Sequence, residues 1–235
     1  MNKLSSLVLA AAMTAFSTSA FAQLSLVTSR ASFPTTDTVN WTTLGPAFTQ
    51  ITSPFTVATT GGSLITVSHN EGTLFERRDQ TTGGWGGNFT FGDALLWNQG
   101  DNGAITFDPQ NLISGAGFNV QSDYPGAFTF RLDAYDVNGV LLGSVTRNGF
   151  SNTVLGSAIF IGFTSPTANV DKFIGTMTSA AVGPSNFAIN TLALSGPTIN
   201  AVAAVPEPST YGLIGATIVL LGVAYRKSRR HSRVC

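Results

Sequence analysis

Between about residues 23 and 195, apolar residues recur in short runs with a period of two, not in the 3.6-residue period of a helix. The clearest run is AFTFRLDAYD, in which every second side chain is apolar. The turn that follows, Asp136-Val137-Asn138-Gly139, contains Asn-Gly, which supplies the positive φ values of a tight hairpin. Residues 140–145 are therefore predicted to return as the partner strand. The predicted core side chains of the first strand are Phe128, Phe130, Leu132 and Ala134.

Similar runs predict further strands along the chain. They lie at residues 63–69, 88–92, 104–108, 115–121, 158–165, 171–179 and 187–194. Regular short strands broken by Gly, Asn, Asp and Pro predict an all-β fold, an antiparallel β-sandwich or jelly-roll-like domain over residues 23–195. Gly162 and Gly175 are expected to mark bulges or close backbone approach. Residues 196–204, with Gly196 and Pro197, are expected to form a linker.

The N-terminus has the pattern of a signal peptide. Lys3 precedes an apolar stretch from Leu4 to about Phe16, and small residues follow at Ala20 and Ala22. These features predict a signal peptide over residues 1–22 and cleavage by signal peptidase after Ala22. The alternative is an uncleaved anchor helix, for which the apolar stretch is short.

The C-terminus combines an apolar segment with a basic tail. Residues 211–225 form a run of fifteen without a charge, which covers about 22 Å of a hydrocarbon layer about 30 Å thick. We expect a single transmembrane helix there, with a basic tail at 226–233 that stays cytoplasmic by the positive-inside rule. The body would then lie outside. The basic residues of the tail are Arg226, Lys227, Arg229, Arg230 and Arg233.

Pro206-Glu207-Pro208 stands directly before this segment. The order of Pro-Glu-Pro, a short Gly-rich apolar helix and an arginine cluster, over residues 205–233, resembles the PEP-CTERM sorting signal. Proteins with this signal are exported by Gram-negative bacteria that make extracellular polysaccharide. The resemblance implies a membrane-embedded exosortase that cuts near the motif, a transient inner-membrane intermediate, and final placement at the cell surface or in the extracellular matrix. The alternative is a proline-rich hinge before a permanent anchor.

Charge separates the body from the tail. Only 10% of the residues are charged and the formal net charge is zero. Residues 23–205, however, hold six basic and eleven acidic residues, a formal net charge of −5. This acidic body predicts no nucleic-acid binding. Cys235 is the single cysteine, which excludes an intrachain disulfide and a cysteine-based zinc site.

The body contains few residues that could form a catalytic or metal-binding site. His69 is the single histidine between residues 23 and 205, and it ends the predicted strand 63–69. The segment DAYDVNG fails the EF-hand register, because Ala134 and Val145 fall on the first and twelfth ligand positions. A structural calcium ion held by other carboxylates stays an alternative, and no cofactor is predicted. Paired carboxylates for glycoside hydrolysis could be drawn from Glu71, Glu76 and the aspartates, but the sequence gives no distances between them.

The segment ERRD at 76–79 and the glycine-rich TTGGWGGN that follows are predicted to form a solvated loop. Trp85 has two predicted roles. Its side chain would either pack into its own domain, or extend from the flexible glycine-rich loop and stack on a sugar ring together with Trp97 and Tyr124. Aromatic rings and planar polar side chains are a combination that holds carbohydrate. For Trp97 the alternative is a core position, since it closes the apolar run ALLW.

The second half of the body also resembles a pattern of bacterial exported β-sandwiches. The matching residues are Gly115, Gly117, Phe118, Val120, Asp136, Asn138, Gly139, Phe160 to Phe163, Phe187 and Ile189. Where such sandwiches often carry Asp after the final Ile, this chain has Asn190. The missing charge weakens any transfer of ion or ligand binding from those proteins.

These observations together predict a non-catalytic exported protein with a structural or adhesive role in the cell envelope, extracellular matrix or biofilm, binding extracellular polysaccharide. Two alternatives stay open. One is a secreted carbohydrate-active enzyme, and the other is a permanently anchored single-pass surface protein.

Overall fold

The computed structural model describes residues 24–196, with the exception of 82–83, 101–102 and 184–185. The chain divides into two units, Met1–Pro197 and Thr198–Cys235, and the described residues all belong to the first. The predicted signal peptide, the sorting signal at 205–233 with its transmembrane segment 211–225, and all of the linker except Gly196 therefore lie outside the described residues. Within the described part, no helix is long and apolar enough to cross a membrane.

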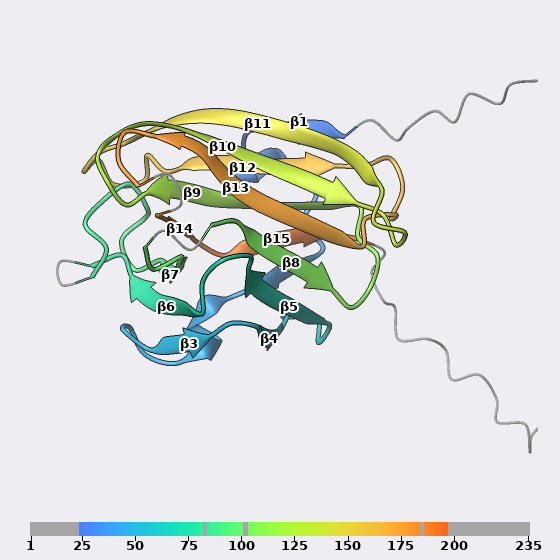
Figure 1. The fold of residues 1–235 in the computed structure, drawn as a ribbon, viewed down its shortest axis with the longest axis horizontal. Coiled ribbons are helices and arrows are strands. Elements are labelled where there is room, and N and C mark those ends of the chain that lie inside the picture. Colours follow the sequence, from blue (N-terminus) through green and yellow to red (C-terminus); the bar gives the residue numbers. More distant parts are fainter. Residues whose placement is uncertain (1–23, 82–83, 101–102, 184–185, 197–235) are drawn as a thin grey trace, which may run out of the picture. The chain divides into compact units, whose positions relative to one another are not determined.

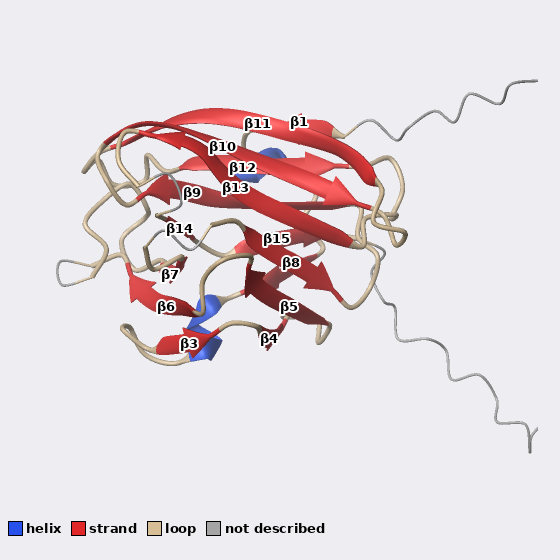
Figure 2. Cartoon of the chain, viewed as in Figure 1, coloured by secondary structure: helices blue, strands red, loops and turns tan. Residues whose placement is uncertain are grey.

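The described residues form strands and two short 3-10 helices, as Figure 2 shows. The helices are η1 (Arg30–Ser32) and η2 (Trp41–Leu44). The strands are β1 (Ser25–Val27), β2 (Asp37–Val39), β3 (Gln50–Thr52), β4 (Phe55–Ala58), β5 (Leu64–His69), β6 (Leu74–Asp79), β7 (Ala94–Trp97), β8 (Ile105–Pro109), β9 (Gly115–Ser122), β10 (Gly126–Tyr135), β11 (Leu141–Ser151), β12 (Ile159–Thr164), β13 (Lys172–Ala180), β14 (Phe187–Ile189) and β15 (Leu192–Ser195).

The strands build two antiparallel sheets (Figure 1). The nine-stranded sheet has the order β1-β12-β9-β14-β7-β6-β3, with β15 beside β9 and β2 beside β15. The six-stranded sheet has the order β11-β10-β13-β8-β5-β4. The prediction of an all-β antiparallel sandwich is confirmed.

Aromatic rings from both sheets fill the space between them. Phe118 of β9 and Phe187 of β14 belong to the nine-stranded sheet, and Phe130 of β10 to the six-stranded one. The ring of Phe130 meets Phe118 at 5.8 Å between centroids and Phe187 at 5.0 Å, in both cases edge to face. All three side chains are fully buried. This contact joins the sheets through the favourable geometry of aromatic pairs.

The predicted hairpin after Tyr135 is confirmed. β10 pairs with β11 in antiparallel register, and Gly139 adopts the positive φ of 75° that the turn requires. The Oδ1 atom of Asp136 accepts hydrogen bonds from the backbone N–H groups of Asn138 and Val140, at 2.9 and 2.8 Å. The return strand continues beyond the predicted residue 145 to Ser151.

Two predicted strands and one predicted loop differ in the structure. Residues 88–92 form no strand, although Phe89 is buried there. The run 187–194 is divided at Asn190 into β14 and β15, which pair with different stretches of β9. The segment 76–79 is not a solvated loop but the end of β6, with Glu76 and Arg77 buried.

The two strand glycines make room for neighbours. A Cβ atom at Gly162 would lie 3.1 Å from the carbonyl oxygen of Ala116, so the expected close backbone approach is confirmed there. A Cβ atom at Gly175 would lie 3.1 Å from Cζ of Phe130. The register shift between β10 and β13 falls at Thr129 and Phe130, so Gly175 accommodates a core ring and does not form a bulge.

Candidate functional site

The outer face of the nine-stranded sheet carries polar side chains. Along β9, Phe118 and Val120 belong to the core between the sheets, so the alternation of a strand places Asn119 and Gln121 on the opposite face. Gln121 pairs across the sheet with Ala188 of β14, which in turn pairs with Trp97 of β7. Trp97 then pairs with Glu76 of β6. These four strands therefore present one row of outward side chains.

Two loops cover this row. The described residues of the β6–β7 loop, 80–81 and 84–93, are hydrogen bonded to the β11–β12 loop, residues 152–158. We call these segments together the loop ridge. Ala158 N–H donates to the carbonyl oxygen of Asn88 at 2.8 Å, and Gly156 N–H to that of Phe89 at 3.1 Å. Two residues of the ridge, Trp85 and Phe89, form a second, small apolar cluster with Leu95 of β7 and Ala188 of β14. The ridge is thus fixed to the sheet by packing and to itself by backbone hydrogen bonds.

A cavity of about 320 Å³ is lined by residues of both loops of the ridge and of the strands beneath them. We call it the tryptophan cavity, because Trp85 from the loop and Trp97 from β7 line it together. Their ring centroids lie 6.3 Å apart, at an interplanar angle of 66°. Trp85 is only 6% exposed, and its indole N–H donates to Oε1 of Gln121 at 2.8 Å. Nε2 of Gln121 donates in turn to the hydroxyl of Ser151 at 2.8 Å, so the position of the indole is set by a hydrogen-bonded chain.

Trp97 is held from its edge and from one face. Its indole N–H donates to Oδ1 of Asn186 at 2.6 Å, and Nδ2 of Asn186 donates to Asp123 at 3.0 Å. The guanidinium of Arg78 lies 4.6 Å from the centroid of the Trp97 ring, a cation-π contact. Burial raises the pKa of the Asp123 carboxyl above its ordinary value, against the opposing effects of the Asn186 hydrogen bond and the charge of Arg78.

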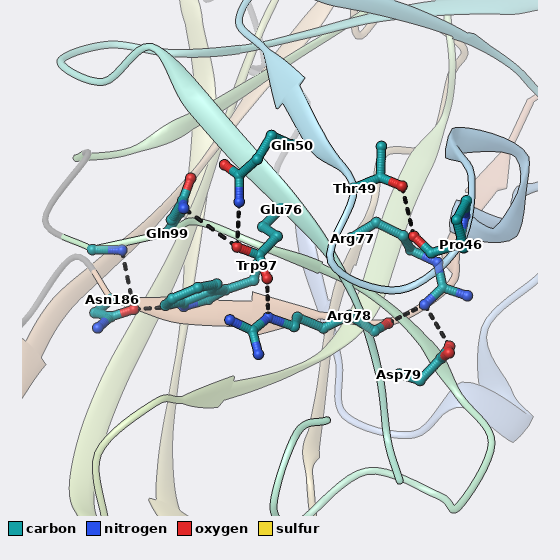
Figure 3. Close-up of polar contacts among 11 residues, drawn as sticks. Pro46, Thr49, Gln50, Glu76, Arg77, Arg78, Asp79, Trp97, Gln99 and Asn186 are labelled. Atoms are coloured by element: carbon teal, nitrogen blue, oxygen red, sulfur yellow. Dashed lines mark hydrogen bonds and ion pairs between the residues drawn. The ribbon is translucent and has the colours of Figure 1, made fainter. Parts of the chain in front are cut away.

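Figure 3 shows how the charges at the end of β6 are compensated. The buried carboxylate of Glu76 pairs with Arg78 and accepts hydrogen bonds from Gln50 and Gln99. Arg77, which is 4% exposed, pairs with Asp79. Buried charges are tolerated where they are paired and hydrogen bonded, and this pairing explains why a run of four charged residues lies within the fold.

The structure brings the three predicted sugar-contacting residues into one region. Trp85 and Trp97 line the same cavity, while Tyr124 is 43% exposed and stands between Asp123 and Pro125, which both line it. The polar residues that line the cavity were not predicted from the sequence; they are Arg78, Gln121, Asp123 and Asn152. Side chains alternate between the two faces of a sheet along residues 74–79 and 115–122. This alternation is the signal that could have shown that Arg78 and Gln121 lie on the same face as Trp97.

His69 and the Asp136 turn have structural partners. The His69 ring is stacked on Phe75 at 3.5 Å between centroids, and its Nε2 lies 2.8 Å from the carbonyl oxygen of Leu74. The Asp136 carboxylate closes the β10–β11 hairpin, as described above. Among the described residues, no group of three or more His, Cys, Asp or Glu side chains is placed to hold a metal ion.

Several solved structures are similar to this chain at low identity. One is CsCBM6-3 from Clostridium stercorarium in complex with cellobiose, with 12% identity, 63% of this chain and 94% of that chain covered, and a TM-score of 0.33. A second is a DUF4465 family protein from Bacteroides caccae, with 11% identity, 73% and 100% covered, and a TM-score of 0.37. A third is the family 11 carbohydrate-binding module from Clostridium thermocellum in complex with a β-1,3-1,4-mixed-linked tetrasaccharide, with 9% identity, 65% and 94% covered, and a TM-score of 0.16. Similarities at these TM-scores do not bear on the function of this chain.

The C-terminal residues give a more specific result. No curated protein matches the chain. A family model does match residues 204–230, and its description is the PEP-CTERM protein-sorting motif. The matched stretch contains Pro206-Glu207-Pro208 and the arginines at 226, 229 and 230. The chain therefore carries a PEP-CTERM sorting motif at its C-terminus, which implies an exported protein that is processed by an exosortase and sorted to the cell surface.

Proposed function

We propose that this protein is a non-catalytic surface or matrix protein whose β-sandwich binds extracellular polysaccharide in the tryptophan cavity. The observation that carries the proposal is the lining of that cavity. Two indole rings meet there with a guanidinium, a carboxylate and carboxamides, supplied by Arg78, Asp123, Gln121 and Asn152. Sugars present C–H faces that pack on rings and hydroxyl groups that need planar polar partners.

The size and rigidity of the cavity support this function. Its volume of about 320 Å³ lies near the lower end of the roughly 300–1,000 Å³ of ligand sites, which suits one or two sugar units. The indole N–H groups of Trp85 and Trp97 are already bonded to Gln121 and Asn186. Sites fixed in advance lose less conformational entropy on binding. The PEP-CTERM motif supplies the matching location, since surface-sorted proteins meet extracellular polysaccharide.

The test is affinity electrophoresis of the full-length chain, purified in a mild detergent, through gels containing hydroxyethyl cellulose, laminarin, dextran or galactomannan. We expect at least one of these polymers to retard the wild-type chain. Gly86 lines the cavity, and a Cβ atom there would meet no atom within 4 Å. Gly86→Leu should therefore obstruct the cavity without disturbing the fold and abolish the retardation.

Gly196→Leu is the matched control. A Cβ atom at Gly196 would meet its neighbours only at ordinary contact distances of 3.7 Å and beyond, and Gly196 is not among the residues that line the cavity. Retardation of Gly86→Leu equal to that of the control would refute the proposed site. Release of reducing ends from the bound polymer would instead refute the non-catalytic part of the proposal and favour a carbohydrate-active enzyme.

A further inference from the structure

A second cavity of about 320 Å³ is lined by other residues of the same two loops. We call it the Arg30 cavity, after the η1 residue that lines it. Asn119 of β9 and Asn190, between β14 and β15, line it from the sheet, and Thr90 and Asp93 line it from the β6–β7 loop. Its lining is therefore dominated by planar and hydroxyl polar groups, which are the partners that sugar hydroxyls require.

A hydrogen-bonded network holds the polar groups of this cavity in place. Nε of Arg30 donates to Asn119 Oδ1 at 3.1 Å, and Nη2 donates to Asn190 Oδ1 at 2.9 Å and to the carbonyl oxygen of Thr191 at 2.8 Å. Nδ2 of Asn190 donates to Asp93 at 3.1 Å. Among the described residues, Nη1 of Arg30 has no hydrogen-bond partner. The guanidinium is thus fixed by two of its nitrogens and keeps donors available for a ligand.

The charges of the cavity favour a neutral ligand. Arg30 and Asp93 are its two charged lining residues among those described, and they carry opposite signs. The surrounding body, residues 23–205, has a formal net charge of −5. A potential of that sign disfavours the approach of polyanions. A neutral polyhydroxyl compound therefore fits the site better than an acidic polysaccharide.

The two cavities share their walls. Asn119 and Gln121 stand two positions apart on the same face of β9, about 7 Å along the strand, and each lines one cavity. The rings of Trp85 and Phe89, which line the tryptophan and Arg30 cavities respectively, are 6.2 Å apart. Both loops of the ridge contribute residues to both cavities. A single extended ligand on this face could therefore contact both of them.

Exposed apolar side chains lie on the segments that border the cavities. Phe91 is 62% exposed and directly follows Thr90, which lines the Arg30 cavity. Val154 and Leu155, on the ridge between Thr153 and Gly156, are 62% and 56% exposed. An exposed ring beside a polar cavity repeats the combination on which carbohydrate binding depends.

From these observations we propose that the Arg30 cavity is a second subsite for the same ligand, and that the ligand is a neutral polysaccharide spanning the loop ridge. This inference rests on the proposed function, because it takes the tryptophan cavity as the first subsite. Two linked subsites raise the apparent affinity for a polymer well above that of either one. Loss of the second subsite should therefore weaken polymer binding without abolishing it.

The test uses the full-length chain, the four neutral polymers named above and alginate as an acidic probe. Thr90→Phe places a large side chain at the exposed rim of the Arg30 cavity, and Phe91→Ala removes the neighbouring ring. We expect each variant to weaken the retardation constant for the bound neutral polymer tenfold or more, and alginate to cause no retardation. Val137→Ala, in the exposed β10–β11 turn, is the control and should bind like wild-type. Urea midpoints equal to that of wild-type would show that the variants fold.

The outcomes separate the two proposals. If Gly86→Leu abolishes binding while Thr90→Phe and Phe91→Ala bind like wild-type, the second subsite is refuted and the tryptophan cavity stands. If Thr90→Phe abolishes binding and Gly86→Leu does not, the proposed first site is refuted instead. Retardation by alginate alone would overturn the neutral ligand, and the absence of retardation by any polymer would overturn both proposals.

Discussion

Replacing Phe130 with alanine tests whether the aromatic contact between the sheets carries the stability of the body. The side chain is fully buried and touches Phe118 and Phe187 of the opposite sheet edge to face. Truncation of a buried Phe costs about 3–5 kcal/mol. Domains of this kind are stable by roughly 5–15 kcal/mol, so the variant should lose about a fifth or more of its free energy of unfolding. The same truncation at Phe150, which is 60% exposed, should cost at most about 0.5 kcal/mol.

A double-mutant cycle with Gly175 tests whether the ring of Phe130 packs against this glycine. Gly175→Ala puts a methyl group 3.1 Å from Cζ of Phe130, and overpacking of this kind costs about 1–3 kcal/mol. In the Phe130→Ala background that methyl group enters the space that the ring has left, so its cost should fall by about 1 kcal/mol or more. Urea unfolding followed by tryptophan fluorescence gives the four free energies of unfolding. Additivity within about 0.5 kcal/mol, or a Phe130→Ala cost below about 1 kcal/mol, would refute the packing described here.

Three further predictions concern His69, Asn190 and the sorting motif. Burial lowers the pKa of His69, so the unfolded chain binds the proton more readily and the free energy of unfolding should fall as the pH drops below about 6.5. In urea titrations at pH 7.5 and 5, His69→Gln should reduce this loss of stability at the lower pH. An equal loss in the variant and the wild-type would contradict the role given to His69. Asn190→Asp would replace the donor 3.1 Å from Asp93 with a second carboxylate, a loss that the bond from Arg30 to the same side chain offsets only in part. The variant should therefore lower the free energy of unfolding by about 1–3 kcal/mol in urea titrations, and an unchanged urea midpoint would contradict this reasoning. Mass spectrometry of the surface-located protein should find that the residues after Pro208 have been removed. A variant with alanine at positions 206–208 should keep these residues. An intact arginine-rich tail in the wild-type surface protein would rule out exosortase cleavage.

The strands of the body could be predicted because their signal is local. In β10, the side chains of Phe128, Phe130, Leu132 and Ala134 are all buried in the core, as the period of two predicts. The pairing of strands could not be predicted from the same pattern. β9 is bordered on one edge by β12 and on the other by both β14 and β15, an arrangement fixed by contacts between segments far apart in the chain. The break at Asn190 that makes it possible has no local apolar or glycine signal.

The charged run at 76–79 shows where composition misleads. Four consecutive charges predict a solvated segment, yet β6 places Glu76 and Arg78 on the outer face and pairs them there. Arg77 points to the other side and pairs with Asp79 two positions on. The ion pairs within the run offset the cost of burial. A run that can neutralise itself in this way looks, in sequence, the same as one that faces water.

The environment of the two tryptophans depends on partners that are distant in sequence. Trp85 donates to Gln121, 36 positions away, and Trp97 to Asn186, 89 positions away. The sequence therefore offered two roles for Trp85, packing within its own domain or contact with a ligand. In the structure the indole is largely buried and also forms part of a cavity wall, so packing positions the ring that we propose contacts a sugar.

The loop ridge explains how irregular segments can form two defined cavities. Asn88 is 1% exposed, and its side chain accepts a hydrogen bond from Asn152 N–H at 2.9 Å and donates one to the carbonyl oxygen of Phe150 at 3.2 Å. Its backbone adopts a φ of 60°, a left-handed conformation that asparagine tolerates better than most residues. The buried carboxamide thus joins the bend of its own loop to the start of the neighbouring loop. Because each loop lines both cavities, this residue helps to fix their walls before any ligand arrives, together with the backbone hydrogen bonds and the packing of the ridge. Preorganisation of the ridge should therefore contribute to affinity alongside the groups that touch the sugar.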